Sequence, residues 1–371
     1  MNYQDKISIV HYAEAEVYGG TLEALYLLAG KQAEEGCDVC VILPASDSLS
    51  AFYKKLSSKN IKFLLMPAAS GPMGYALSFM RLFSGADILH IHRHISFSGI
   101  LTVFAAKIKG AAKIIATEQF YAVEIQSPAL RLLKYISAFL CFRVIAVSGD
   151  VRRSIIAKHH APAFKVGIIS NGVETGRFAG AEIDQRLLAL AGAEQGDFII
   201  VSVSSVEHRK GCYRLVSLAG ELLKCGLKFK IIVAGSGPDL EKMRDLAKAS
   251  GAGSKVIFTG YLEGTERLYA SGSLFILLSD REGMPLSVLE AMAAGLPVVV
   301  SDFEGAKEQV VEGETGYIVD RNDIRYAAKK IEFLAGNAPA LSSMAAGAKK
   351  RSEIFDIKKI WGLYRDLYLQ K

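Results

Sequence analysis

Short apolar segments alternate with longer helical patterns along almost the whole chain, and this alternation constrains the fold more than any other feature. The first half contains KISIVHY, CDVCVIL, IKFLLM, DILHIH, AKIIAT and RVIAVS, and the second contains FIIVSVSS, FKIIVAG, KVIFTG, SLFILLS and PVVVS. Short runs rich in Val and Ile, separated by helices, are typical of parallel strands in a sheet covered on both faces. The sequence therefore predicts an α/β fold.

The length of 371 residues is too great for one ordinary hydrophobic core, so we expect two domains. Turn-forming residues gather between Val173 and Asp197, and we set the domains at 1–175 and 176–355. Each is predicted to be a doubly wound, Rossmann-like domain, and the two should face each other across a cleft. Ligands of such sheets bind beyond the carboxyl ends of the strands, and a cleft of this kind suits a reaction of two substrates.

Composition favours a folded protein of a reducing compartment. Hydrophobic residues make up 51% of the chain and charged residues 22%. No apolar run reaches the roughly 18 to 20 residues of a membrane span, and the N-terminus MNYQDKISIVHY lacks a secretory signal pattern. The five cysteines are scattered, and the Cys37–Cys40 pair lacks the partners of a metal or redox site. We therefore expect a cytoplasmic protein.

Positive charge is concentrated in the first half. Residues 60–175 contain 13 Lys and Arg against 5 Asp and Glu, which favours an anionic partner. Nucleic acid is not expected, because no basic stripe interleaved with aromatic residues is present. The segment PALRLLKYISAFLCFR (128–143) carries Arg131, Lys134 and Arg143 among apolar residues. It either lies on an anionic membrane surface as a peripheral helix or packs on the sheet with its cations in water.

Two strand-to-helix junctions have the composition of phosphate-binding turns. Gly19 and Gly20 precede a helix, where glycine lets the backbone approach a ligand and free N–H groups attract an anion. A tight turn is the steric alternative. In VSVSSVEHRKGCYRL, Lys210 and Gly211 follow a strand, and the lysine could neutralise a diphosphate unless it is simply solvated.

The segment SDREGMPLSVLEAMAAGLPVVVSD (279–302) places two acids around a predicted helix from Pro285 to Ala294, which stops at Gly295. Glu282 and Gly283 precede the helix, and Glu290 lies about one and a half turns into it. Helix-start N–H groups could hold a phosphate while both carboxylates accept hydrogen bonds from sugar or ribose hydroxyls. The alternative makes Glu282 a helix-start acid and Glu290 a solvated one, but the apolar neighbours of Glu290 disfavour it.

Two further motifs carry less functional information. AGSGPD (234–239) resembles a phosphate loop, but we interpret it as a tight turn between a strand and a helix. His90, His92 and His94 alternate along one strand face and could bind zinc. No acid with ligand spacing accompanies them, so we predict no metal site, and His90 or His92 could instead face the cleft.

At this point the chain resembles the retaining GT-B glycosyltransferases of family 4 over nearly its whole length. EGMPLSVLE resembles the E-x7-E motif of that family and is the most specific part. ISNGVETGRF resembles its inter-domain segment, RKG its donor loop and VYGGTLEAL its N-terminal glycine loop. IWGLYRDLYLQK resembles the last helix, which implies that residues 356–371 return to the first domain.

The resemblance implies a UDP- or GDP-linked sugar as donor, with no cofactor and no metal, and transfer with retention by same-face attack. Glu290 would bind the ribose, Glu282 the sugar, and Lys210 the departing diphosphate, where positive charge lowers the barrier. The remaining implied donor contacts are Gly283, Met284, Pro285 and Leu286 around the helix start, Ser205 and Arg209 in the donor loop, and Gly19 and Gly20 over the phosphates.

Two positions depart from the family pattern. Ser205 stands where many relatives have an arginine, and Arg209 or His208 is the alternative source of that charge. Glu118 and Gln119 stand where relatives often have a catalytic histidine, so His92 or Glu118 is the alternative catalytic group.

The leading hypothesis is a hexosyltransferase that extends a glycan, glycolipid or other acceptor in cell-surface polysaccharide or glycoconjugate synthesis. It would act in the cytoplasm or at the inner face of the membrane. One alternative is a nucleotide-sugar-binding protein of the same fold with weakened catalysis, which the two departures motivate. Another is a nucleotide-sugar isomerase or epimerase. A Rossmann oxidoreductase is disfavoured, because the chain lacks a strand–GxGxxG–helix unit followed by an acid.

Overall fold

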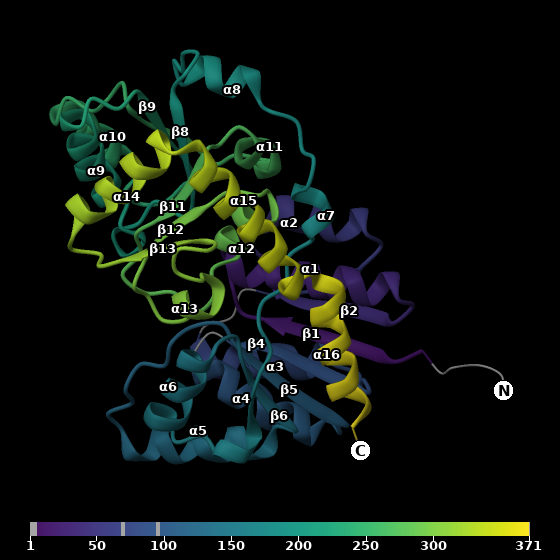
Figure 1. Cartoon of the computed structure of the whole chain (residues 1–371). Coiled ribbons are helices and arrows are strands. Elements are labelled where there is room, and N and C mark those ends of the chain that lie inside the picture. The colour runs from purple at the N-terminus through teal and green to yellow at the C-terminus, as the bar shows by residue number, and fades with distance from the viewer. Residues whose placement is uncertain (1–5, 68–70, 94–96, 371) are drawn as a thin grey trace. The chain divides into compact units, whose positions relative to one another are not determined.

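The computed structural model of the chain describes residues 6–67, 71–93 and 97–370 (Figure 1). The chain divides into two compact units. The first comprises residues 1–172 together with 357–371, and the second comprises residues 173–356. The last segment of the chain is therefore part of the first unit.

The described part of the first unit contains a seven-stranded parallel sheet of order β3-β2-β1-β4-β5-β6-β7. Its strands are β1 (Ser8–Ala13), β2 (Asp38–Pro44), β3 (Lys62–Met66), β4 (Ile88–Arg93), β5 (Lys113–Glu118), β6 (Arg143–Ala146) and β7 (Val166–Ile168). The sequence predicted all of these strands except β7, which lies at one edge of the sheet.

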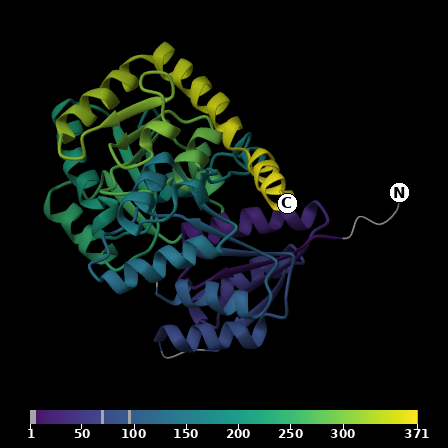
Figure 2. The same cartoon turned by 90° about the horizontal axis from the view of Figure 1, so that it is seen from below.

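Helices connect these strands and cover the sheet. They are α1 (Gly20–Glu34), α2 (Ser50–Ser58), α3 (Gly71–Leu82), α4 (Phe97–Ile108), α5 (Pro128–Leu140), α6 (Gly149–His159) and α16 (Ile357–Leu369), with the 3-10 turns η1 (Asp47–Leu49) and η2 (Ala163–Lys165). One face of α1 is apolar and buried, since Leu22, Leu25, Leu28 and Ala29 are at most 4% exposed. Helix α16 lies beside α1 in both views (Figures 1 and 2).

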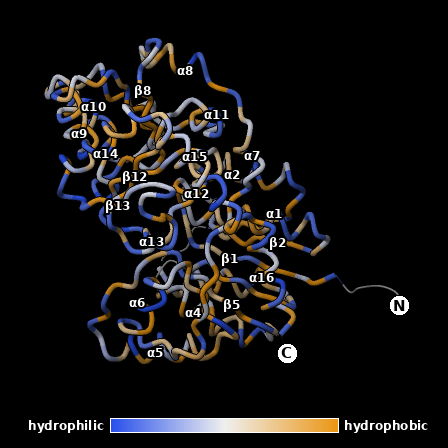
Figure 3. Tube along the Cα trace, in the orientation of Figure 1, coloured by the Kyte–Doolittle hydropathy of each residue, from blue (hydrophilic) through white to orange (hydrophobic). Residues whose placement is uncertain are grey.

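The second unit also alternates parallel strands with helices, and its sheet has the order β10-β9-β8-β11-β12-β13. Its strands are β8 (Phe198–Val203), β9 (Phe229–Ala234), β10 (Val256–Gly260), β11 (Leu274–Leu277), β12 (Val298–Ser301) and β13 (Gly316–Val319). Every residue of β9 is buried, as expected for a strand covered on both faces. Hydrophobic segments, drawn in orange, mark strands such as β8 and β12 in Figure 3.

The helices of the second unit complete the fold. They are α7 (Thr175–Phe178), α8 (Gln185–Leu190), α9 (Cys212–Lys224), α10 (Leu240–Ala249), α11 (Thr265–Ala270), α12 (Leu286–Ala293), α13 (Ala306–Gln309), α14 (Ile324–Gly336) and α15 (Ala338–Ser352), with η3 (His208–Lys210) and η4 (Glu353–Phe355). The prediction of two doubly wound parallel α/β sheets is confirmed.

Helix α5 buries a cation that was expected to lie in water. Lys134 is only 4% exposed and packs with Ser137 and Ala138, so the expectation that the cations of this helix lie in water is wrong for Lys134. Its nitrogen lies 3.9 Å from Glu118 at the end of β5, which supplies a negative partner.

Among the described residues, no helix is both long enough and apolar enough to span a bilayer.

Candidate functional site

Two loops of the second unit bring a lysine and a glutamate together. Lys210 follows β8, and Glu282 lies between β11 and α12. Lys210 Nζ donates a hydrogen bond to Glu282 Oε1 at 2.5 Å, and the Ser279 hydroxyl donates to the same oxygen at 2.9 Å. Arg209 Nη1 lies 3.8 Å from Glu282 Oε2. The side chain of Glu282 is 4% exposed, so two cations and a hydroxyl stabilise a carboxylate that is almost fully buried.

The turn after Lys210 requires glycine. Gly211 has a φ of +68°, and a Cβ at this position would lie 2.0 Å from the carbonyl oxygen of Leu278. Leu278 immediately follows β11 and starts the loop that contains Glu282. The Lys-Gly pair therefore brings the backbones of the two loops into contact, which places Lys210 next to Glu282.

Helix α12 begins one residue later than predicted, because Pro285 is its N-cap residue, with φ −66° and ψ 127°. The helix ends at Ala293, and Gly295 has a φ of +79°, as expected for a glycine that stops a helix. Among the described residues, no side chain caps the start of α12. The first N–H groups of such a helix are the kind that bind an anion.

Glu290 has a protein partner that sequence reasoning missed. The Tyr269 hydroxyl, from α11, donates a hydrogen bond to Glu290 Oε2 at 2.8 Å. Burial, and then the neighbouring Glu290 carboxylate, raises the pKa of the Tyr269 phenol well above its usual value, so this hydroxyl remains a donor. Glu290 is half-buried, which agrees with the expectation that an acid among apolar neighbours needs partners. No sequence signal links the two residues, because Tyr269 lies on another helix.

The other predicted donor-loop residue, Ser205, is exposed, and its hydroxyl donates to Glu207 Oε1 at 3.0 Å. Arg209 donates to the same Glu207 oxygen at 2.8 Å. Gly283 and Met284 are buried in the loop between Glu282 and α12. The second unit thus brings together Lys210, Arg209 and Glu282, and Ser205 is linked to Arg209 through Glu207.

The two predicted glycines of the first unit lie at the start of α1. Gly19 is extended, with a φ of −172°, and a Cβ at either Gly19 or Gly20 would have no described neighbour within 4 Å. Their conformation therefore gives no steric reason for glycine. In AGSGPD the opposite holds, because a Cβ on Gly235 or Gly237 would lie 1.8 Å or 2.3 Å from the carbonyl oxygen of Ser204 or Val206.

The predicted catalytic candidates of the first unit are both buried. Glu118 is the last residue of β5, is 1% exposed and faces Lys134. Gln119 follows it, and its Oε1 accepts a hydrogen bond from Asn171 Nδ2 at 2.9 Å. His92 lies on β4 and is 4% exposed. His94 of the predicted histidine row lies outside the described residues.

A second strand supplies a histidine that the sequence pattern did not indicate. His11 of β1 pairs in register with His90, and the ligand atoms of His11, His90 and His92 lie within 4.8 Å of one another. Gln32 Oε1 can only accept, so His11 Nε2 donates to it at 2.6 Å. His11 Nδ1 then accepts from His92 Nε2 at 2.9 Å. Burial lowers the pKa of His11 to about 4 and those of His90 and His92 well below 6.5, so the imidazoles are neutral at pH 7.

His90 connects this cluster to the C-terminal helix. The Tyr368 hydroxyl lies 2.7 Å from His90 Nδ1, and His90 Nε2 lies 2.7 Å from Thr117 Oγ1. Thr117 in turn lies 3.1 Å from the hydroxyl of Tyr364. Both tyrosines belong to α16, so a buried polar network fastens this helix to the first sheet. Hydrogen bonds thus engage both nitrogens of His11 and of His90.

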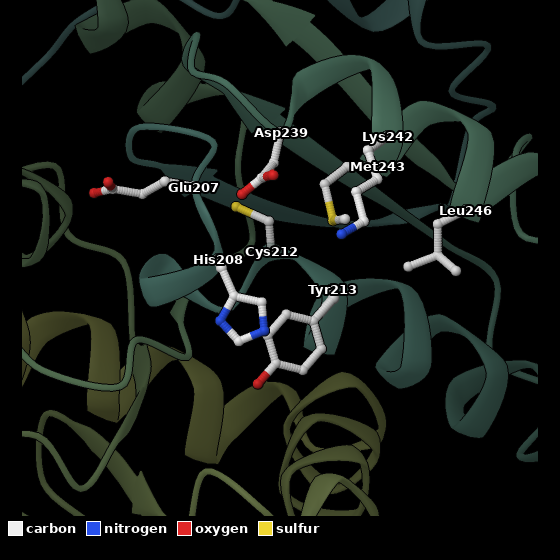
Figure 4. A pocket seen from close by; sticks show the side chains of 8 residues that line it. All are labelled: Glu207, His208, Cys212, Tyr213, Asp239, Lys242, Met243 and Leu246. Atoms are coloured by element: carbon white, nitrogen blue, oxygen red, sulfur yellow. The ribbon is translucent and has the colours of Figure 1, made fainter.

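A pocket of about 170 Å³ lies beside the lysine loop, between α9 and α10 (Figure 4). Its lining contains neither Lys210 nor Glu282. Burial raises the pKa of the Cys212 thiol in its wall to about 11, which leaves this cysteine protonated and a poor nucleophile. The pocket therefore adjoins the donor loop through Glu207 and His208. Its eight lining residues are Glu207, His208, Cys212, Tyr213, Asp239, Lys242, Met243 and Leu246.

The chain matches two family sequence models, one in each half. The family described as "Glycosyl transferases group 1" matches residues 189–351, which include Lys210, Glu282 and Glu290. The family described as "Glycosyltransferase Family 4" matches residues 18–177. Together the two matches indicate a glycosyltransferase of the GT-B type.

Three known proteins illustrate this similarity. The chain is 24% identical to UDP-Gal:alpha-D-GlcNAc-diphosphoundecaprenol alpha-1,3-galactosyltransferase of Escherichia coli, over 75% of this chain and 73% of that protein. It is 25% identical to the capsular polysaccharide biosynthesis glycosyltransferase CapM of Staphylococcus aureus, over 64% of each. The crystal structure of HepE of Anabaena in complex with UDP and glucose matches with a TM-score of 0.81 and 18% identity, over 97% of this chain and 98% of that one. The last likeness shows the fold.

Proposed function

Because the two family matches indicate a GT-B glycosyltransferase, we propose that this chain transfers a hexosyl group from a UDP- or GDP-linked sugar with retention of anomeric configuration. The acceptor is a glycan, glycolipid or other molecule used in the synthesis of cell-surface polysaccharide or glycoconjugate. The names of the E. coli and S. aureus relatives support this acceptor class. The observation that carries the proposal is the Lys210–Glu282 contact beside the uncapped start of α12.

In the proposed donor complex, each group of this cluster binds a different part of one nucleotide sugar. Lys210 binds the diphosphate and stabilises the negative charge that develops as it departs. The first N–H groups of α12 bind the same anion, with the backbone of residues 283–286 around it. Glu282 accepts hydrogen bonds from sugar hydroxyls, and Glu290, oriented by Tyr269, accepts them from the ribose.

Donor binding then replaces the hydrogen bond between Lys210 and Glu282 by two hydrogen-bonding contacts with the donor, one from Lys210 to the diphosphate and one from the sugar to Glu282. The Lys210–Glu282 hydrogen bond joins the group assigned to the diphosphate and the group assigned to the sugar. Lys210 moves from the carboxylate to the diphosphate, and Glu282, still held by Ser279, becomes available to the sugar. Arg209 Nη1, 3.8 Å from Glu282 Oε2, remains as a positive charge beside the carboxylate after this exchange.

On the acceptor side, the proposal retains Glu118 and His92 as alternatives to the histidine of the family pattern. Glu118 is 1% exposed and lies 3.9 Å from the Lys134 ammonium. The Nε2 of His92 is already committed to His11. The proposal requires neither a metal ion nor a cofactor, since lysine, arginine and helix N–H groups provide the positive charge.

Helix α5 supports a peripheral membrane location at the inner face of the membrane. Its outer face is apolar and exposed, with Leu132 at 60% and Phe139 at 52%. Lys165 Nζ lies 5.5 Å from the centre of the Phe139 ring, so cations adjoin this face and favour an anionic surface. We expect a Leu132→Ser/Phe139→Ser variant to lose sedimentation with anionic vesicles, whereas Leu190→Ser, at a more exposed site of the second unit (84%), retains it. Equal sedimentation of both variants would contradict the membrane assignment.

A second candidate function is nucleotide-sugar binding with weakened catalysis. Gln119 stands where the family pattern has a histidine, and its amide is buried and bonded to Asn171. The two candidates separate in a transfer assay with a panel of UDP- and GDP-sugars and lipid-linked or glycan acceptors. Product with retained anomeric configuration, abolished in Glu282→Ala, supports the transferase. Donor binding without transfer or hydrolysis supports the binding protein, and product formed without any acceptor identifies an isomerase or epimerase.

A further inference from the structure

One buried arginine in the second unit contacts the loop that contains Glu282. Arg214 lies in the first turn of α9 and is 7% exposed. Its Nη1 donates to the carbonyl oxygen of Leu278 at 3.1 Å, and its Nη2 lies 2.7 Å from Asp280 Oδ1. The guanidinium carbon also lies 4.7 Å from the centre of the Tyr213 ring, which packs against it. Both terminal nitrogens of the guanidinium thus have oxygen partners, and the Tyr213 ring packs on one of its faces.

The contacts of Arg214 are part of a wider connection between the two loops. The Asp280 N–H donates to the carbonyl oxygen of Arg209 at 2.8 Å, and Arg209 Nη1 donates to the carbonyl oxygen of Arg281 at 2.9 Å. Arg214 is four residues after Lys210, and Asp280 is two residues before Glu282. The Arg214–Asp280 pair therefore joins the same two loops as the Lys210–Glu282 bond.

Arginine is suited to this position because its planar fork presents donors at a fixed spacing, so a carbonyl and a carboxylate can be held together. Lysine offers three donors on a single mobile nitrogen, so it lacks the two nitrogens at fixed spacing that make these contacts. Gly211 completes the arrangement, because a Cβ there would lie 2.8 Å from Arg214 Nη1 as well as 2.0 Å from Leu278 O. The missing side chain of Gly211 makes room for the guanidinium contact.

We infer that Arg214 is a positioning residue for sugar transfer, which fixes the separation of Lys210 and Glu282 through the backbone of residues 278–280. The inference rests on the proposed function and adds a residue that touches neither donor nor acceptor. Reacting groups must be held within about an ångström, and a displacement of that size costs about 100-fold in rate. Loss of Arg214 should therefore lower kcat far more than it weakens binding of the nucleoside diphosphate.

The test compares Arg214→Met and Arg214→Lys with Arg244→Met, an arginine of α10 that also joins a carboxylate to a carbonyl, Glu241 and the oxygen of Phe258. Hydrogen–deuterium exchange of the amides of residues 278–284 is measured together with kcat, donor KM and the Kd of UDP and GDP. We expect about a 30- to 100-fold fall in kcat for both Arg214 variants. The Kd of the nucleoside diphosphate should change less than about threefold, and the loop amides should exchange faster. Arg244→Met should leave all four unchanged.

Unchanged loop exchange or a kcat within twofold of wild type in a folded Arg214→Met protein would overturn the inference while leaving the proposed function intact. If Arg214→Met does not fold, Asp280→Asn removes the same ion pair at a partner whose side chain is 31% exposed. This variant must then show the same large fall in kcat with a nearly unchanged Kd of the nucleoside diphosphate. Wild-type protein that binds no nucleotide sugar would overturn the proposed function, and the inference with it.

Discussion

Replacing Glu282 by glutamine separates the two effects that its carboxylate combines. Glutamine has nearly the same shape and can still accept the hydrogen bond of Ser279, but it carries no negative charge and no longer forms an ion pair with Lys210. Under the proposed mechanism, Lys210 must leave Glu282 to reach the diphosphate. The variant should therefore bind the nucleoside diphosphate more tightly than the native protein, although it loses activity.

The size of this gain follows from the Lys210–Glu282 bond. A hydrogen bond to a charged group contributes about 1.5–3 kcal/mol. The lysine side chain is 16% exposed, which weakens the bond, so we take about 1.4 kcal/mol, which is about tenfold in Kd. The sugar loses its charged acceptor at the same time, and removal of a preorganised electrostatic contact costs about 100-fold or more in kcat.

Isothermal titration calorimetry with the nucleoside diphosphate and with the corresponding nucleotide sugar measures both effects. Glu282→Gln should bind the diphosphate about tenfold more tightly and should lose most of the additional affinity that the sugar provides. Glu221→Gln is the matched control, since Glu221 also accepts from a lysine, Lys224, at 2.6 Å on the surface of α9. If Glu282→Gln binds the diphosphate more weakly than the native protein, Glu282 does not compete for Lys210 and the exchange mechanism is wrong.

Three further perturbations test other parts of the site and fold. Glu290→Ala should weaken donor binding about 10- to 100-fold in calorimetry, because it removes a charged acceptor of the ribose, and an unchanged Kd would contradict that role. Gly211→Ala should lower both the thermal midpoint and kcat, because its Cβ would lie 2.0 Å from Leu278 O, and an unaltered midpoint would show that the two loops separate easily. The lowered pKa values of His11, His90 and His92 mean that the unfolded chain, whose imidazoles titrate near 6.5, binds more protons in acid. Stability should therefore be fully present above pH 6.5 and fall towards pH 4 by up to about 1.4 kcal/mol per pH unit for each histidine, and a thermal midpoint that is flat from pH 7 to 5 would refute this.

Two strands, β7 and β13, were not predicted because neither has the apolar run on which the sequence-based prediction depends. β7 is only three residues long and has a glycine at its centre, so it offers no apolar run. β13 begins at Gly316, where a Cβ would lie 2.0 Å from the carbonyl oxygen of Val298. Both are edge strands. Close backbone packing selects glycine at Gly316, and in a sequence that glycine indicates a turn rather than a strand.

The residues of the candidate site could be predicted from local sequence patterns, but the contact between them could not. Lys210 and Glu282 each carry a local signal, a Lys-Gly turn and an acid before a helix. Their direct contact depends on sheet order and on the approach of Gly211 to Leu278, which no local pattern encodes. The histidine cluster is similar, because register places His11 of β1 beside His90 of β4.

Helix α5 shows how packing decides between alternatives that composition leaves open. Its cations and apolar residues alternate closely enough that either face could meet the sheet. The structure buries Lys134 opposite Glu118 and leaves Leu132, Tyr135, Ile136 and Phe139 exposed. A buried carboxylate at the end of a neighbouring strand supplies the partner that makes this orientation possible.

The central claim is that the start of α12 and its two acids hold one nucleotide sugar. A thermal-shift screen of the native chain and Glu290→Ala against UDP- and GDP-sugars tests it most directly. We predict that the sugars of one nucleotide raise the native midpoint and that the same ligands raise the midpoint of Glu290→Ala much less at equal concentration. A screen in which no nucleotide sugar raises the midpoint of the native chain, or in which both proteins respond equally, would contradict the claim.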